Sequence, residues 1–140
     1  MSGRAFLDSN IFVYSVDQRD PLKQSIANDL FRSLAIEGHA VISYQVIQEF
    51  FNWALVKSSI KMTADEARHY LITTFRPLHV VPPSIALITD AIRIQDRYRL
   101  SWYDSLIVAA AQYAGCKLLY SEDLQHGQQF GAVTVSNPFL

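Results

Sequence analysis

The chain has 140 residues, of which 50% are hydrophobic and 18% charged, with 12 basic and 13 acidic side chains. This length and composition suffice for one folded core, which excludes a disordered or low-complexity chain. The formal net charge of -1 excludes a protein whose whole surface binds polyanions, but it allows a local nucleic-acid site. We therefore expect a single domain over residues 1–140.

Cysteine and histidine usage favours a cytoplasmic protein without zinc. Cys116 is the only cysteine, so no internal disulfide can form, and the four histidines lack the close spacing of a zinc site. Only three apolar residues separate Arg4 from Asp8, too few for the apolar region of a signal peptide. The longest strictly apolar run, residues 106–111, is far shorter than a membrane span. We predict a cytoplasmic protein that does not enter a membrane.

The rest of the pattern alternates short strands with helices. Capping signals mark helix starts, as where Asp20 precedes Pro21 or where Thr63 stands three residues before Glu66. The expected elements, in chain order, are a strand over 4–8, a short helix from 10, a helix over 21–38, a strand over 40–43, helices over 44–55 and 64–75, a strand over 78–81, helices over 84–92 and 101–115, and strands over 117–120 and 132–135. This order predicts an α/β protein with helices on both faces of a mostly parallel sheet.

Four acids are expected at one edge of this sheet. Right-handed crossovers bring strand carboxyl ends and helix amino ends to the same edge, where ligands bind. Asp8 ends the first strand, Asp123 follows the strand over 117–120, and Asp104 lies in the first turn of a helix. Glu49 lies about a turn and a half into its helix, and its side chain leans back toward that edge. The four carboxylates are therefore predicted to converge.

Converging carboxylates require a positive charge among them, because like charges at short range oppose joint ionisation. Oxygen ligands of this kind suit Mg²⁺ or Mn²⁺, which commonly bridge to the phosphate oxygens of a substrate. One or two such ions can activate water for an in-line displacement at phosphorus. The acids therefore indicate a metal-dependent nuclease.

Each acid also has a purely structural interpretation. Asp8 can cap the turn into the segment that follows it. Glu49 lies on a polar helix face, where a solvated side chain is the simpler explanation. Asp104 stands three residues after Ser101, a spacing that a capping box explains without chemistry. The functional interpretation depends on the shared edge.

Four segments resemble, in order, the motifs of the PIN domain family, and most closely those of VapC-type toxin ribonucleases of toxin-antitoxin pairs. The segments are FLDSNIFVY at 6–14, SYQVIQEF at 43–50, SWYDSLIVAA at 101–110 and LLYSEDLQHG at 118–127. In this register the family's acidic residues are matched by Asp8, Glu49, Asp104 and Asp123, and its supporting polar positions by Asn10 and Ser121. Glu122 offers a second carboxylate in the last motif, although the family register favours Asp123.

The resemblance implies a three-layer α/β/α sandwich with four to five short strands. It also implies a Mg²⁺- or Mn²⁺-dependent endoribonuclease, the toxin of a type II toxin-antitoxin pair. In that enzyme Asp8, Asp104 and Asp123 hold the metal, and Glu49 completes the cluster or positions water. The alternative is a catalytically inactive PIN-like module that binds or interacts without cleaving.

Three arginines that follow the predicted helix over 84–92 are candidates for RNA contact. Arg93, Arg97 and Arg99, with Tyr98 among them, combine guanidinium groups for phosphates with an aromatic face for a base. A solvated helix face explains the same residues without RNA.

The resemblance further implies a homodimer and a small cognate antitoxin as partners. Phe50, Phe51, Trp53 and Leu55 exceed what one helix face ordinarily buries. They are therefore a candidate surface for either partner.

Overall fold

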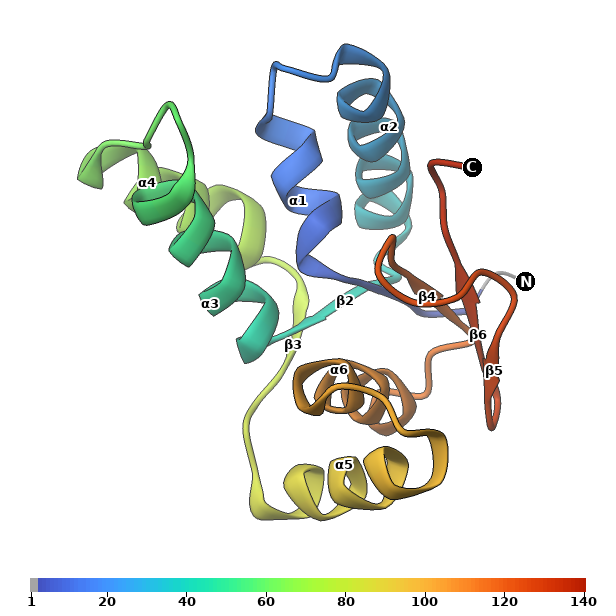
Figure 1. Cartoon of the computed structure of the whole chain (residues 1–140). Coiled ribbons are helices and arrows are strands. Elements are labelled where there is room, and N and C mark those ends of the chain that lie inside the picture. The colour runs from blue at the N-terminus through green and yellow to red at the C-terminus, as the bar shows by residue number, and fades with distance from the viewer. Residues whose placement is uncertain (1–2) are drawn as a thin grey trace.

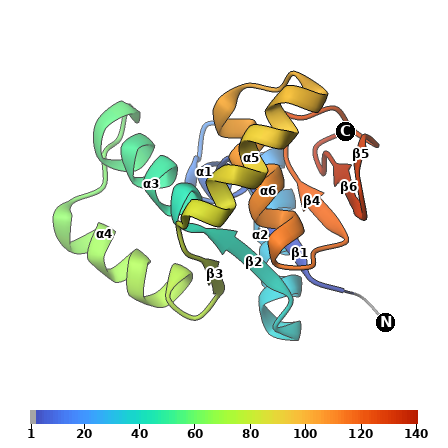
Figure 2. The ribbon, with the colours of Figure 1, turned by 90° about the horizontal axis from the view of Figure 1, so that it is seen from below.

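A central sheet lies between two helical layers in the computed structural model, which describes residues 3–140 (Figure 1). The strands are β1 (Ala5–Leu7), β2 (Ala40–Ser43), β3 (His79–Val81), β4 (Leu118–Tyr120), β5 (Gln129–Phe130) and β6 (Val133–Ser136). The helices are α1 (Ser9–Val16), α2 (Pro21–Glu37), α3 (Tyr44–Asn52), α4 (Ala64–Tyr70), α5 (Ile85–Tyr98) and α6 (Trp102–Tyr113), and two π-helical turns, η1 (Trp53–Lys57) and η2 (Leu71–Phe75), extend α3 and α4. Seen from below, α5 and α6 cover one face of the sheet, with α1 and α2 behind it (Figure 2). This arrangement confirms the predicted three-layer sandwich.

The sheet runs in the order β3-β2-β1-β4-β6-β5, and each neighbouring pair is parallel except β5 with β6. Within residues 3–140 it therefore has six strands, whereas we predicted four to five. The additional strand, β5, has only two residues and pairs antiparallel with β6 across a turn at Gly131. A two-residue strand is too short to show the alternation by which strands are predicted.

The helices begin where side chains can satisfy their first backbone N–H groups. Ser43 accepts a hydrogen bond from the N–H of Val46, and Thr63 forms the predicted reciprocal capping box with Glu66. The other helix starts predicted from caps, at Asp20, Ser84 and Ser101, carry the same type of bond. None of the helices in the described part of the chain has the length and apolar character needed to cross a bilayer.

An aromatic cluster fixes the α3–α4 hairpin beside α1. Phe50 is fully buried and stacks on Tyr70 with ring centroids 4.6 Å apart, and Phe75 packs edge-on to both Phe50 and Phe12. Phe51 packs into the same cluster. Phe50 is therefore a core residue and Phe51 packs against the core, whereas Leu55 is 40% exposed. That part of this surface meets a partner stays a prediction. The cluster holds α3 at the edge of the sheet where β1 ends.

Candidate active site

Asp8 lies at the carboxyl end of β1 and is almost completely buried, with 3% of its surface exposed. Its Oδ1 accepts a hydrogen bond from the backbone N–H of Ser9 at 2.7 Å, which also caps α1. Its Oδ2 accepts a 2.7 Å hydrogen bond from the Ser121 hydroxyl. Because β1 and β4 are paired neighbours, Asp8 and Ser121 each follow the last residue of adjacent strands. The capping and the site interpretations of Asp8 are thus compatible.

Glu49 reaches back along α3 to the same edge, as predicted. Its Oε1 accepts a 3.1 Å hydrogen bond from the Ser9 hydroxyl, beside Asp8. Its Oε2 accepts a 3.3 Å bond from the Gln45 amide, which also donates to the carbonyl of Tyr103. Gln45 therefore ties α3 to the first turn of α6, which carries Asp104.

The loop after β4 brings Asp123 to the same place. The backbone N–H of Asp123 donates to the Ser121 hydroxyl at 3.1 Å, so Ser121 joins this loop to Asp8. The Asn10 amide donates to Asp123 Oδ2 at 3.3 Å. Asn10 Oδ1 is buried and has no hydrogen-bond partner among the described residues. Both polar residues predicted to support the acids thus contact them.

Glu122 points away from the other acids toward Lys23 and Tyr14. The Tyr14 hydroxyl donates to Glu122 Oε1 at 2.6 Å, and Lys23 Nζ donates to Oε2. Burial raises the pKa of Glu122, but the hydrogen bonds from Lys23 and Tyr14 outweigh it and hold the pKa below its ordinary value. Asp123, not Glu122, is therefore the loop carboxylate that faces the acids.

The four acids are coupled electrostatically. Burial raises the pKa of Asp8 from 3.8 to about 7; the hydrogen bonds from Ser121 and Ser9 oppose this rise, and the charges of Glu49 and Asp123 add to it. Partial desolvation likewise raises the pKa of Asp123, and Asp104 and Glu122 contribute further by repulsion. The site therefore has an excess of negative charge.

Two of the four acids, Glu49 and Asp123, line an open cleft of about 530 Å³ together with Ser9 and Asn10. Across residues 3–140, no three His, Cys, Asp or Glu side chains are already close enough to hold a metal ion as they stand. The donor set nevertheless fits a hard divalent cation, because among the described residues no cation forms an ion pair with the four carboxylates and none gives the buried Asn10 Oδ1 a hydrogen bond.

The arginines predicted to contact RNA lie elsewhere. Arg93 and Arg97 line a separate hollow of about 400 Å³, together with Tyr98. Arg93 and Arg99 form exposed ion pairs with acids one turn earlier on α5. Their contact with RNA stays a prediction.

Arg19 and Lys57 line the acidic cleft, and no sequence pattern marks either residue as part of a site. Arg19 lies in the turn before α2, and Lys57 is the last residue of η1. The packing of α1 against α3 brings them together, and no local motif encodes that packing.

Comparisons with known proteins identify the family and the fold of the chain. A family model described as PIN domain matches residues 5–128. The fold is similar to that of the Mycobacterium tuberculosis toxin VapC20, described as sarcin-ricin loop cleaving, with 16% identity, a TM-score of 0.68, and coverage of 85% of this chain and 89% of that one.

Two toxin-antitoxin structures are also similar. FitAB bound to an IR36 DNA fragment gives 16% identity and a TM-score of 0.73 over 97% of this chain and 96% of that chain. VapBC2 from Rickettsia felis, bound to a promoter fragment, gives 17% identity and a TM-score of 0.67 over 95% and 97%. A comparison with curated proteins gives no match. At these identities the structural likeness establishes the fold.

Proposed function

Because the chain belongs to the PIN domain family, we propose that it is a metal-dependent endoribonuclease, the toxin of a type II toxin-antitoxin pair. One observation carries the proposal: acids from four distant segments of the chain act on one another's charge at the carboxyl edge of the sheet. Packing alone does not favour such a cluster, because each carboxylate raises the cost of ionising its neighbours. A bound cation offsets that cost.

Asp8, Asp104 and Asp123 would hold Mg²⁺ or Mn²⁺, with Glu49 completing the cluster or positioning water. When bound, such an ion supplies a water of lowered pKa and stabilises the charge that develops on the phosphate. The all-oxygen donor set supports Mg²⁺ or Mn²⁺ over softer metals. The same donors are compatible with one ion or two.

The polar residues around the acids orient them. Ser121 donates to Asp8 and accepts from the backbone of Asp123, so a single hydroxyl holds two of the acids in place. Asn10 donates to Asp123 and keeps its own Oδ1 buried beside the cluster. Such fixed positioning lowers the reorganisation required when substrate binds.

Of the four acids, Glu49 is the one best placed to accept a proton from water. It lines the cleft, and both of its oxygens accept hydrogen bonds from neutral groups, the Ser9 hydroxyl and the Gln45 amide. A carboxylate held in this way can orient an attacking water and accept its proton. The phosphodiester is then hydrolysed directly, without a covalent enzyme intermediate.

The proposal includes a homodimer, a small antitoxin and a cytoplasmic location. Support for a protein partner comes from the exposed side chains of Leu71 and Ile72, which line a hollow of about 380 Å³ with Val80 of the edge strand β3. Exposed apolar side chains grouped in this way are a feature of interfaces. Similarity to toxin-antitoxin complexes supports an antitoxin, and similarity to a sarcin-ricin loop cleaving toxin supports RNA as substrate.

A buried, unreactive thiol at Cys116 is compatible with a reducing compartment.

The test is cleavage of a mixed RNA pool by the purified protein with Mg²⁺, with Mn²⁺ or with EDTA. We expect cleavage with either metal, none in EDTA, and none by Asp8→Asn or Asp104→Asn. Cleavage that persists in EDTA or in both variants would refute the mechanism. RNA binding without any cleavage would support the inactive module instead.

A further inference from the structure

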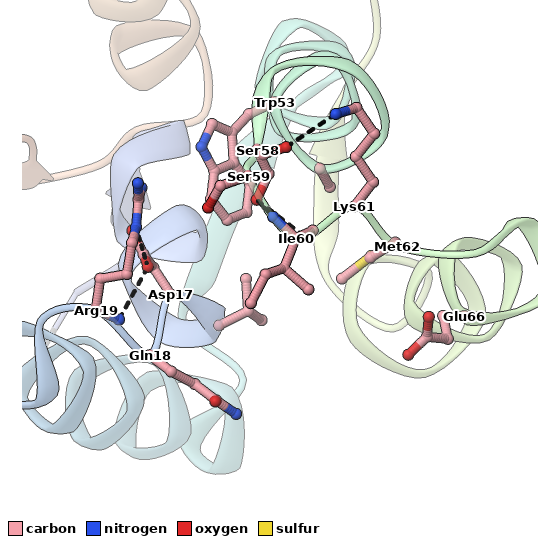
Figure 3. Close-up of a pocket in the computed structure, with 12 residues that line it drawn as sticks. Asp17, Gln18, Arg19, Trp53, Ser58, Ser59, Ile60, Lys61, Met62 and Glu66 are labelled. Carbon is pink, nitrogen blue, oxygen red and sulfur yellow. Dashed lines mark hydrogen bonds and ion pairs between the residues drawn. The ribbon is translucent and has the colours of Figure 1, made fainter.

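The acidic cleft continues away from the acids, between the α1–α2 turn and the end of α3. A second hollow of about 300 Å³ adjoins it there, and Asp17, Arg19 and Trp53 line both (Figure 3). The two hollows form one groove, with Glu49 and Asp123 at one end and Arg19 where the hollows meet. We refer to the part of this groove that Arg19, Trp53 and Lys57 line as the side arm.

The guanidinium of Arg19 is held in place at the rim of the side arm. Its Nε and Nη2 donate to the two carboxylate oxygens of Asp17 at 3.0 and 2.9 Å. The Arg19 side chain is 65% exposed, whereas that of Asp17 is 12% exposed. A guanidinium has five N–H donors, so donors remain for an incoming anion, and the Asp17 pair fixes their direction beforehand.

Trp53 provides a supported aromatic surface opposite Arg19. Its ring lies 6.1 Å from that of the fully buried Phe50, and it stands between the end of α3 and the Asp17–Arg19 pair (Figure 3). The N–H of Ser58 donates to the Trp53 carbonyl at 2.8 Å, which closes the π-helical turn and directs the chain back along the groove. π-helical turns occur frequently at functional sites.

We infer that the side arm binds the unpaired RNA strand next to the scissile phosphate, with Trp53 stacked on a base and Arg19 and Lys57 on backbone phosphates. The inference rests on the proposed nuclease function, since the acids define the point of cleavage. Cations beside an aromatic face are the usual means of holding a single strand. Hollows of about 530 and 300 Å³ are large enough for an extended single strand.

The test measures binding and cleavage separately. The probe is a fluorescein-labelled, mixed-sequence single-stranded RNA of about 12 nucleotides, read by anisotropy in an Asp104→Asn background so that the RNA stays intact. Trp53→Leu keeps apolar bulk but removes the ring, and we expect it to weaken binding at least about fivefold. Trp53→Phe keeps a ring and should retain most of the affinity. Thermal melting confirms that both variants are folded.

Removing the charges of Arg19 and Lys57 should change the salt dependence of RNA binding. Arg19→Ala combined with Lys57→Ala should weaken binding and reduce the slope of log K against log salt by about 1.4, because each phosphate contact to a single strand contributes about 0.7. The matched control removes two exposed cations elsewhere, Arg32→Ala with Arg68→Ala, and should leave the affinity unchanged. Tyr113→Leu serves the same purpose for an exposed aromatic ring.

The possible outcomes test the side arm and the proposed nuclease function separately. If the unmodified protein cleaves RNA but the Trp53 and cation variants bind RNA as tightly as their parent, the inference about the side arm is overturned and the proposed nuclease function is retained. The groove then belongs to another class of ligand, such as a protein segment. If RNA binding depends on Trp53 and on the two cations but the unmodified protein never cleaves RNA, the side arm is supported as an RNA-binding site and the proposed nuclease function is refuted. Equal losses in the control variants would also overturn the inference.

Discussion

Replacing Asp8 with asparagine should stabilise the metal-free protein at alkaline pH. Folding raises the pKa of this carboxyl from 3.8 to about 7, chiefly by burial. The folded state therefore holds the proton more tightly than the unfolded state, so the free energy of unfolding falls as pH rises between these two values. A difference of about three pKa units corresponds to about 4 kcal/mol, all of it lost above about pH 7.

Asparagine removes this cost, keeps the hydrogen bond from Ser9 and reverses the direction of the one with Ser121. Its Oδ1 can still accept from the N–H of Ser9, and its Nδ2 can donate to the Ser121 hydroxyl, which has a free lone pair for it. In EDTA at about pH 8, Asp8→Asn should therefore melt about 10 °C above the unmodified protein, and near pH 4 the two should melt together. Mg²⁺ at about pH 8 should stabilise the unmodified protein far more than the variant.

Thermal and urea unfolding in EDTA across this pH range provide the assay. Asp65→Asn is the matched control, because the Asp65 side chain is 92% exposed and should give no such pH-dependent gain. A melting temperature of the unmodified protein that stays level from pH 4 to 8, or an Asp8→Asn variant that is no more stable at pH 8, would refute the electrostatic reasoning.

Three further predictions concern individual side chains around the cleft. Glu122→Gln should retain most activity because Glu122 faces Lys23, whereas Asp123→Asn should abolish cleavage; equal losses in an RNA cleavage assay would contradict this assignment. Ser121→Ala removes a hydroxyl shared by two acids and should cost about 1–3 kcal/mol of stability, measured by urea unfolding, as well as lowering kcat more than KM; a change in KM alone would argue against positioning. Arg93→Ala with Arg97→Ala should lower the salt slope of RNA binding by about 1.4 if both contact phosphate, and an unchanged slope would remove them from the interface.

Local signals in the sequence were enough to predict most of the fold. Asp20 with Pro21, Ser43 and Thr63 begin helices because their side chains satisfy the first N–H groups, and this chemistry depends on only a few consecutive residues. The left-handed cap at Gly38, with φ 72°, ends α2 where predicted. The two-residue strand β5 was missed because it forms by pairing with β6 and has too few residues for a pattern.

The site was predictable only in part. The positions of Asp8 and Asp123 follow from where their strands end, because neighbouring parallel strands share an edge. The direction of Glu122 depends on Lys23, 99 residues earlier, and nothing local indicates that contact. The burial of Phe50 and the approach of Arg19 to the cleft likewise depend on how α1 packs against α3. Tertiary packing, not motif, therefore determines which charged residues face the acids.

The most direct test of the central claim is anomalous diffraction from crystals grown with Mn²⁺. We predict a peak at the carboxyl edge of the sheet, with oxygens of Asp8, Asp104 and Asp123 at about 2.0–2.6 Å. The absence of a peak at saturating Mn²⁺, or a peak held by other residues, would contradict the account.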